Sequence, residues 1–528
     1  MNSDVQHHHP SVPHESHAAR VRGTGHQSIP SNSTAFTVNE SMVPFKLEPT
    51  DTTTTTPPNG GVDDTDTDGP HHPEPRVLLE RIPTILQPSI PWRERLMHFT
   101  FAWYTVTLST SGVSLVLAIT PHRFRGLSTI GLVIFLLDLF FFLVITGSIT
   151  LRFVLHRLTF RRAFTRPNEA LFVPTFFLSI AAILCNVAEY ARIFIFDDDI
   201  SYRFNGHSST STTSHSIPWF SNSTLANSTL SSGLGQSTPS EPDDSSAPSA
   251  SLTSFRTFLC IAFWLFSAVT FLASVIQYHL LFTVKAERRL SLTTITPAWV
   301  LPIFPVMLIG TLAGSFSKTQ DPKSAIGIIC AGLAAQGLGL LVSFFFFSSY
   351  LSRLMAFGLP AQRPGMFIAV GPPSFTGAAV ISMASDIPRV FEQLQSLNSS
   401  QITILTGVHV GSTSTDTLAA GVKLSAIWLG VFLWGLGFWF FVSAVAGIVA
   451  GMPADKKFHL SWWSIVFPNV GFTIASIKIG QGLGSEGVLW MGSGLTVALV
   501  LAWAFIGYRC VRAVVRREIV WPGHDEDS

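Results

Sequence analysis

Ten apolar segments, separated by polar stretches of different lengths, constrain this chain more than any other feature of its sequence. Each is about 20 residues long or more, the length at which an α-helix crosses the roughly 30 Å hydrocarbon core of a bilayer. They cover residues 98–119, 126–151, 170–196, 255–284, 295–316, 324–350, 366–384, 422–450, 462–481 and 487–509. Only 12% of the residues are charged, about half of the roughly 25% found in soluble domains. The sequence therefore predicts an all-α membrane protein with ten transmembrane helices.

Charge balance and missing motifs exclude several classes of function. Lys and Arg number 33 and Asp and Glu number 32, so that a nucleic-acid partner is not expected. The sequence lacks a G-x-x-x-x-G-K-[ST] phosphate loop, which excludes an ATP-driven pump, and it lacks an H-E-x-x-H zinc motif. Four widely spaced cysteines fit neither a disulfide framework nor a zinc site. We expect no metal, no organic cofactor and no enzymatic activity.

Basic residues in the short connections predict the orientation of the chain. Five arginines lie between residues 152 and 166, and three basic residues lie at 285–289, whereas the connections on the opposite side have fewer. We therefore place both termini in the cytoplasm. Residues 1–95 are a polar tail with too little apolar surface to fold and are expected to be disordered. We expect residues 96–515 to form the ten-helix membrane domain and residues 516–528 to form a second cytoplasmic tail.

Glycosylation motifs give an independent marker of this orientation. Asn222 and Asn227 belong to Asn-x-Ser/Thr motifs in the long loop 197–254, and Asn398 belongs to one in the loop after the seventh segment. Both loops lie outside the cell in the predicted topology, so we expect these three asparagines to be glycosylated. Asn32 lies in the cytoplasmic tail and should remain unmodified.

Odd-numbered and even-numbered segments differ in composition. Four of the five odd segments contain proline, and the first contains a run of Ser and Thr instead, whereas the even segments lack internal proline and are rich in Phe and Leu. Proline leaves a backbone carbonyl without its helical partner, which lipid does not tolerate. The odd helices should therefore lie inside, kinked by Pro and Gly, around a central pore. Five helical hairpins are the simplest architecture, and ordinary proline tolerance in a packed bundle is the alternative.

Polar side chains on the odd segments are candidates for the substrate path. Glu189 and Arg192 lie three residues apart on one helix face. They would form either a proton-titrated carboxylate beside an anion-binding guanidinium or a structural ion pair. Lys478, with Thr473 and Ser476 upstream, would attract an anion, or its long side chain would reach the membrane interface.

A break in the seventh segment provides further candidates. Ser374 and Thr376 follow the string Gly371-Pro372-Pro373. A helix that is broken here would present N–H groups and a positive dipole end to an anion, and a plain kink is the alternative. Asp138, on an even segment, is expected to form a packing contact or an inter-helix hydrogen bond.

Three motifs carry a resemblance to a known family. They are His98-Phe-Thr-Phe-Ala-Trp-Tyr, Arg363-Pro-Gly-Met-Phe-Ile-Ala-Val-Gly-Pro-Pro-Ser-Phe-Thr and Trp462-Trp-Ser-Ile-Val-Phe-Pro-Asn-Val-Gly-Phe-Thr. Together they resemble the tellurite-resistance/dicarboxylate transporter family, whose fold is shared by the plant slow-type anion channels. The second and third motifs are especially similar to its fungal malic-acid transporter branch. The resemblance covers roughly residues 90–515.

This resemblance implies a fold, an assembly and a gate. Family members have ten helices in five hairpins with the odd helices inside, and they form homotrimers with a separate pore in each subunit. A phenylalanine of the ninth helix blocks the pore. By its position in the third motif, Phe467 is the implied gate, and Phe472 is the competing candidate.

The residues and the resemblance together predict a plasma-membrane transporter for a small anion, a C4-dicarboxylate such as malate, coupled to protons. The first alternative is an anion channel or sulfite exporter on the same fold. A second alternative is a membrane receptor or scaffold that binds a partner through the loop 197–254. The alternation of proline-bearing helices argues against this last possibility, because a scaffold needs no kinked interior.

Overall fold

The computed structural model describes residues 91–196, 250–396, 412–451 and 458–519. Contacts between residues divide the chain into Met1–Glu74 and Pro75–Ser528, and all described residues belong to the second unit. They form helices and turns, with no strand in any of the described ranges. The predicted glycosylation sites Asn222, Asn227 and Asn398 lie outside the described residues, as does Asn32.

Nine helical segments among the described residues are long and apolar enough to cross a membrane. They are Phe101–Ile119, Leu127–Leu155, Pro167–Phe194, Leu252–Phe282, Pro322–Phe357, Arg363–Leu394, Asp416–Gly451, Leu460–Leu483 and Glu486–Val515. Each overlaps one of the ten predicted segments. The chain is therefore an all-α, multi-pass membrane protein, as predicted.

The predicted fifth segment, 295–316, is interrupted. It consists of the 3-10 helix η6 (Pro297–Val300) and the α-helix α10 (Phe304–Phe316), followed by the 3-10 turn η7 (Ser317–Thr319). The 13 residues of α10 span about 20 Å, less than the hydrocarbon core. The expected number of ten helices therefore depends on counting these three short elements as one crossing.

Long helices alternate between the inside and the outside of the bundle. The inner helices are α3 (Tyr104–Ile119), α7 (Pro174–Ala191), α10, α12 (Gly371–Ala384) and α16 (Phe467–Leu483). The outer helices are α4 (Leu127–Leu155), α9 (Ala250–Phe282), α11 (Pro322–Phe357), α15 (Ser412–Gly451) and α17 (Glu486–Val515). In the four odd-numbered crossings among these nine segments, 61–89% of the most apolar stretch is buried, against 22–33% in the five even-numbered ones. The predicted inside and outside positions are thus observed.

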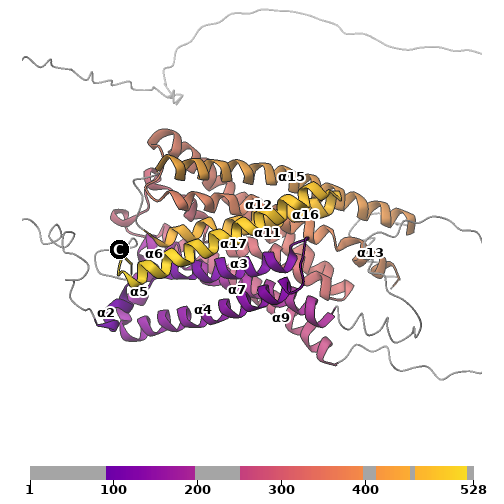
Figure 1. Cartoon of the computed structure of the whole chain (residues 1–528), viewed down its shortest axis with the longest axis horizontal. Helices are drawn as coiled ribbons and strands as arrows, with labels where there is room; N and C mark the ends of the chain where they lie inside the picture. Colours follow the sequence, from indigo (N-terminus) through magenta and orange to yellow (C-terminus); the bar gives the residue numbers. More distant parts are fainter. Residues whose placement is uncertain (1–90, 197–249, 397–411, 452–457, 520–528) are drawn as a thin grey trace, which may run out of the picture. The chain divides into compact units, whose positions relative to one another are not determined.

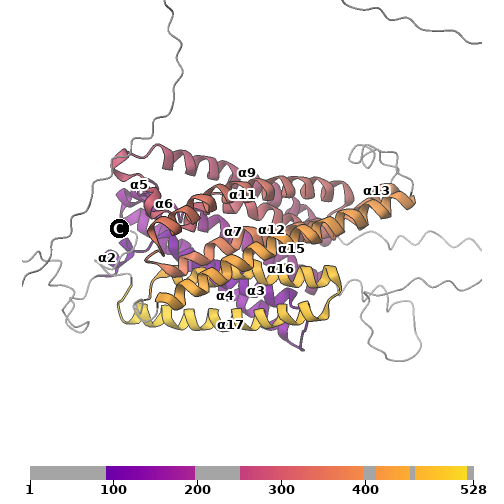
Figure 2. The same ribbon diagram turned by 90° about the horizontal axis from the view of Figure 1, so that it is seen from above.

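Contacts between the inner helices close into a ring. Helix α3 packs on α7, α7 on α10, α10 on α12, α12 on α16, and α16 packs back on α3. Figure 1 shows α15 and α4 at opposite edges of the bundle with α3, α12 and α16 between them. In the perpendicular view of Figure 2, α9 and α17 lie at opposite edges of the bundle. Each inner helix packs on the outer helix that follows it in the chain. The outer helix α9 contacts α7 in this way, but it packs more extensively on the next inner helix, α10.

Prolines mark where the inner helices begin. Helix α7 starts at Pro174, α12 carries Pro372 and Pro373 in its first turn, and Pro305 and Pro468 are the second residues of α10 and α16. Proline is compatible with the first turn of a helix, where its missing N–H has no intrahelical partner. The predicted kinks therefore take the form of breaks between a short helical turn and the following α-helix.

Short elements precede or connect the long helices. They are α2 (Trp92–Met97), η2 (Phe101–Trp103), α5 (Arg157–Thr165), α6 (Pro167–Ala170), the π-helical turn η3 (Arg192–Phe196), η4 (Ala286–Arg288), η5 (Leu292–Thr294), η8 (Arg363–Val370), α13 (Ile387–Ser396) and η9 (Leu460–Ile465). Helices α3, α10, α12 and α16 each follow a 3-10 helix, and α7 follows α6 and a turn.

The Ser and Thr side chains of the first crossing join α3 to its neighbours. Thr107 Oγ1 and Ser179 Oγ lie 2.7 Å apart, and Asn186 Nδ2 donates to Ser111 Oγ at 2.9 Å. These pairs rise in the same order along α3 and α7, which shows that the two inner helices run parallel. The hydroxyl run of α3 thus contributes to helix packing.

Candidate anion path

Three phenylalanine rings meet inside the inner ring. Phe304 of α10, Phe375 of α12 and Phe467 of α16 are all buried. The ring centroids of Phe375 and Phe467 are 5.0 Å apart, and the ring of Phe304 lies 5.9 Å from each of them. These are contact distances for aromatic rings. Three neighbouring inner helices therefore bring one ring each to a common point near the starts of their α-helical parts.

Two glycines make room for this aromatic triad of Phe304, Phe375 and Phe467. A Cβ added at Gly471 would lie 2.5 Å from the Phe375 ring, and one added at Gly371 would lie 2.9 Å from the Phe304 ring. Neither position could hold a larger residue unless a ring moved. The rings thus pack directly against the backbone of neighbouring inner helices.

The competing gate candidate faces the opposite side of α16. The Phe472 ring stacks on Trp434, with centroids 5.2 Å apart, and on Phe441, at 5.6 Å. Both partners belong to the outer helix α15. Of the two predicted gate residues, Phe467 is therefore the one whose ring meets those of other inner helices.

Charged side chains gather near the carboxyl-terminal ends of α7, α10 and α16. Arg192 Nε donates to Glu189 Oε2 at 3.1 Å. Lys318 and Lys478 lie within electrostatic range of the same carboxylate and of each other. Glu189 is buried, whereas the three basic side chains are partly exposed. This basic cluster of Glu189, Arg192, Lys318 and Lys478 carries three positive and one negative formal charge, and it lies where the negative helix dipole ends favour cations.

Helix α16 connects the aromatic triad to the basic cluster. Phe467 is its first residue, and Lys478 follows 11 residues later. Eleven residues make about three helical turns, so both side chains lie on one face of the helix, about 16 Å apart along its axis. The two features are thus successive points along the same side of one inner helix.

Two of the predicted path hydroxyls bond to outer helices. Thr376 Oγ1 accepts from Gln336 Nε2 of α11 at 2.8 Å, and Ser476 Oγ accepts from Trp434 Nε1 of α15 at 2.9 Å. These hydrogen bonds tie the inner helices α12 and α16 to the outer helices α11 and α15.

The other two predicted hydroxyls also lie apart from the basic cluster. Thr473 donates to the Asn469 carbonyl of its own helix at 2.8 Å. Ser374 Oγ has no hydrogen-bond partner among the described residues, and it faces α15, where a Cβ added at Gly437 would lie 2.5 Å away. The structure thus brings Glu189, Arg192 and Lys478 together but not the four hydroxyls.

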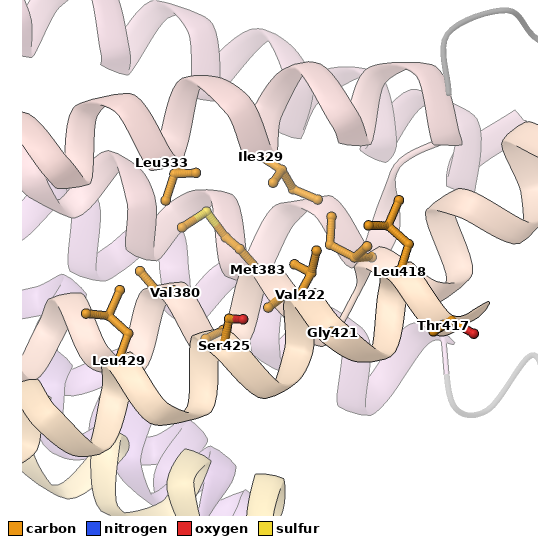
Figure 3. Close-up of a pocket in the computed structure, with 13 residues that line it drawn as sticks. Ile329, Leu333, Val380, Met383, Thr417, Leu418, Gly421, Val422, Ser425 and Leu429 are labelled. Carbon is orange, nitrogen blue, oxygen red and sulfur yellow. The ribbon is translucent and has the colours of Figure 1, made fainter. Parts of the chain in front are cut away.

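A pocket of about 1000 Å³ lies on the side of the bundle, away from the aromatic triad. Figure 3 shows Ile329 and Leu333 of α11, Met383 of α12, and Val422 and Leu429 of α15 around it. Its lining residues include no charged side chain. Such a groove suits apolar material and not an anion.

A smaller polar pocket of about 380 Å³ adjoins the basic cluster and shares Lys318 with it. Arg256 and Arg389 also line this pocket. The Arg389 guanidinium bonds both oxygens of the buried Asp386 carboxylate, at 2.8 and 3.0 Å. Basic groups thus extend from the cluster to this pocket.

Sequence reasoning missed three residues of this site: Phe304, Phe375 and Lys318. A repeated dipeptide was a usable signal for the first, because Phe304-Pro305 at the start of α10 matches Phe467-Pro468 at the start of α16. Phe375 does not share this signal, because it follows the proline pair Pro372-Pro373 by two residues instead of preceding a proline. Lys318 carries no such local signal, because only the closing of the ring brings it to Glu189.

Fold and site together define a class of protein. A multi-pass helical bundle with a closed inner ring, basic at one end and aromatic inside, is suited to moving small anions across a membrane. Comparison with known families agrees, since the model of the voltage-dependent anion channel family matches residues 98–511. The chain belongs to this family, which confirms the expected membership of the tellurite-resistance/dicarboxylate transporter group.

Curated relatives fall into two groups. A malic acid transport protein of Schizosaccharomyces pombe is 28% identical over 449 residues, which are 84% of this chain and 84% of the relative. A putative malic acid transport protein of the same yeast is 28% identical over 448 residues, 83% of this chain and 85% of the relative. A sulfite efflux pump of Trichophyton rubrum is 21% identical over 416 residues, 78% of this chain and 89% of the relative.

Proposed function

We propose that this protein carries C4-dicarboxylate anions such as malate through the centre of the inner ring and that the transport is coupled to protons. The observation that carries the proposal is the net charge of the basic cluster, in which Arg192, Lys318 and Lys478 surround one carboxylate. Its net charge of two matches a doubly ionised dicarboxylate. A guanidinium forms paired hydrogen bonds with a carboxylate, and an ammonium attracts the second carboxylate as a point charge.

The proposal makes Phe467 the gate, with Phe304 and Phe375 as its partners. Rings in mutual contact leave no width for an anion, so passage requires that at least one of them turns away. Apolar constrictions of this kind close a path by excluding water. Phe472 is assigned to the packing of α16 on α15.

The proposed substrate path therefore contains Glu189, Arg192 and Lys478, to which we add Lys318. The hydroxyl residues Ser374, Thr376, Thr473 and Ser476 are assigned to the packing of the inner helices. Their bonds or contacts to α11, α15 or their own helix support this division. The proposal assigns transport to the chain and no enzymatic reaction.

We propose further that the protein lies in the plasma membrane as a homotrimer with both termini in the cytoplasm. Exposed arginines of α5, at the end of the bundle where the inner helices begin, support this orientation. Outer helices expose large apolar side chains such as Phe432 and Leu501, which suit either lipid or a neighbouring subunit. In this orientation Asn222, Asn227 and Asn398 are outside the cell, and the basic cluster faces outward.

A second candidate function is a passive anion channel or a sulfite exporter on the same fold. The aromatic triad favours it, because three apolar rings provide no group that selects a dicarboxylate over a smaller anion. The family match and the similarity to sulfite efflux pumps favour it as well.

Uptake of radiolabelled malate into cells that lack their own carrier separates these functions. We expect uptake to be greater at pH 5.5 than at pH 7.5, two values at which most of the malate is doubly ionised, and to collapse when a protonophore is added. Surface labelling serves as the control for expression. If protein at the surface takes up no malate, the dicarboxylate proposal is wrong, and currents of chloride and sulfite under voltage clamp would then establish the channel function.

A further inference from the structure

Four carboxyl side chains of the described residues are buried, and one of them differs from the rest. Three are paired with an arginine: Glu169 with Arg152, Glu189 with Arg192, and Asp386 with Arg389. The fourth is Asp138 of the outer helix α4, whose side chain is completely buried. Neither of its oxygens has a hydrogen bond of normal geometry in the described part of the chain, and no basic residue there forms an ion pair with it.

Asp138 faces the inner helices at the level of two other polar residues. The Ser111 hydroxyl of α3 is the side chain directed at its carboxyl group. Asn186 of α7 donates to the Ser111 hydroxyl, and the Asn186 Oδ1 atom is buried without a partner among the described residues. Asp138, Ser111 and Asn186 thus form a polar layer across α4, α3 and α7 that contains one carboxyl group and an unused acceptor.

The charged groups of the helices around Asp138 are either paired with one another or lie at a distance from its carboxyl group. On α7, Glu189 and Arg192 bond each other. On α4 itself, Arg152 is 14 residues away and bonds Glu169, about 21 Å along the helix. The charged residues of α2 and α5, which also contact α4, lie at that same end.

Two tyrosines of α3 and α7 lie on either side of this layer along the bundle, and both have partners of their own. Tyr190 of α7 bonds the Ser114 hydroxyl at 3.0 Å and stacks on Phe135, and Tyr104 of α3 bonds the Thr146 hydroxyl at 2.9 Å. Phenol groups are neutral in the pH range of the experiments below. Asp138 therefore has no cation against which a negative charge could be balanced.

An isolated carboxylate in such a place is strongly unfavourable, because burial removes its hydration and nothing replaces it. With a proton the group is neutral and is able to donate a hydrogen bond to an acceptor of the polar layer. We propose that Asp138 is a proton-binding site of the bundle and the group that takes up the coupled proton during transport. The coupling part of this inference rests on the proposed function.

Helix α7 links this site to the substrate path. Asn186 lies three residues before Glu189, one helical turn from the basic cluster. When Asp138 loses its proton, a charge appears between α4 and α3, and the tight packing of this layer becomes unfavourable. A movement of α3 and α7 that hydrates the carboxylate would also displace Glu189 and Arg192.

Stability of the purified full-length protein tests the proton site without reference to any substrate. If the folded state binds a proton that the unfolded chain releases, the unfolding temperature falls as the pH rises. We expect a steeper fall between pH 5 and pH 8 in the wild type than in Asp138→Asn, which keeps the shape of the protonated group. Asp138→Glu, which retains a titratable carboxyl, should keep the steeper fall.

If the unfolding temperature fell with pH equally steeply in the wild type and in Asp138→Asn, Asp138 would not be the proton site. Should Asp138→Asn not fold, infrared difference spectra of the wild type labelled with ¹³C-aspartate replace the comparison. Loss of a protonated-carboxyl band between pH 5 and pH 8 supports the site, and the absence of that band overturns it.

Malate uptake tests the coupling separately. In Asp138→Asn we expect the ratio of uptake at acid and neutral pH to fall to about one, with protonophore sensitivity lost, because the variant has no proton to exchange. Glu189→Gln is the matched control and should reduce uptake at every pH while keeping the ratio. If Asp138→Asn retains proton-coupled uptake, the inference fails and the proposed function stands. If the wild type takes up no malate but the stability difference is found, the proposed function fails and the proton site stands.

Discussion

Helices α15 and α16 lie side by side, yet they meet the membrane in opposite ways. Helix α15 runs unbroken for 40 residues, and only 28% of its most apolar stretch is buried, whereas 78% is buried in the crossing that contains α16. Trp428 and Phe432 of α15 are exposed. Helix α16 instead follows a 3-10 turn, begins with Phe467-Pro468 and has a lysine among its last residues.

The difference follows from what lipid tolerates. An unbroken helix satisfies its own backbone hydrogen bonds and is therefore stable in hydrocarbon with almost any apolar sequence. A crossing with breaks, glycines and charges is tolerated only where protein or water covers it. The outer helices thus isolate the inner ring from lipid, and the features that bear on transport are found on the inner helices.

Two phenylalanines of α16 provide the most sensitive test of this division. Truncation of a packed phenylalanine removes about 3–5 kcal/mol of packing. At Phe467 that loss falls on the closed arrangement of the three rings, so in Phe467→Ala we expect anion flux per protein at the surface to rise about tenfold or more. Flux is measured as labelled malate uptake or as current.

Phe472→Ala is the matched control, because its ring packs against α15. We expect less protein at the surface but an unchanged flux per molecule. If Phe467→Ala had the wild-type flux at the wild-type amount of surface protein, Phe467 would not be the gate. An equal rise in both variants would show that loosening α16 is enough to open the path, whichever way the ring faces.

The division into inner and outer helices was predictable from sequence, but the direction in which individual side chains point was not. Proline in alternate segments predicts burial because the freed carbonyl must be covered, a constraint that holds wherever the helix starts. Whether Phe467 or Phe472 faces the centre depends on the rotation of α16 about its axis, and one residue of uncertainty turns a helix by about 100°. The hydroxyls Ser374, Thr376 and Ser476 face outer helices for the same reason.

Long-range neighbours were equally beyond sequence reasoning. Lys318 comes within electrostatic range of Glu189 only because α10 lies between α7 and α12 in the ring. Asp138 was expected to form an inter-helix hydrogen bond or a packing contact, and the structure buries it against α3 with the Ser111 hydroxyl directed at its carboxyl group, a partner that the sequence did not identify. In both cases the sequence indicates the residue type and its depth, while the partner is determined by the assembled bundle.

Two lysines test whether the basic cluster acts as a substrate site. Lys318 belongs to the cluster, and Lys323 lies at the same end of the bundle, exposed at the start of the outer helix α11. Hydrogen bonds to charged groups contribute about 1.5–3 kcal/mol, so we expect Lys318→Gln to weaken the apparent affinity for malate by about tenfold. Lys323→Gln should leave it unchanged, since exposed charges are screened.

Concentration dependence of uptake provides the affinities for this comparison. Arg192→Ala should resemble Lys318→Gln, with the added effect of leaving Glu189 without its arginine. If Lys318→Gln and Lys323→Gln had the same affinity as the wild type, the cluster would be a structural ion-pair network, and the charge argument for a dicarboxylate would lose its basis.

Two glycines give the smallest expected effect, and they test how tightly the inner ring is packed. A Cβ at Gly471 would lie 2.5 Å from the Phe375 ring, whereas a Cβ at Gly147 of the outer helix α4 would meet nothing within 4 Å. Gly471→Ala should therefore lower the stability by about 1–3 kcal/mol through overpacking. Gly147→Ala should raise it by about 0.5–1 kcal/mol through the better helix propensity of alanine. Thermal unfolding in one detergent should show shifts of opposite sign. If Gly471→Ala were as harmless as Gly147→Ala, the rings would have room to move, and contact among them could not be what closes the path.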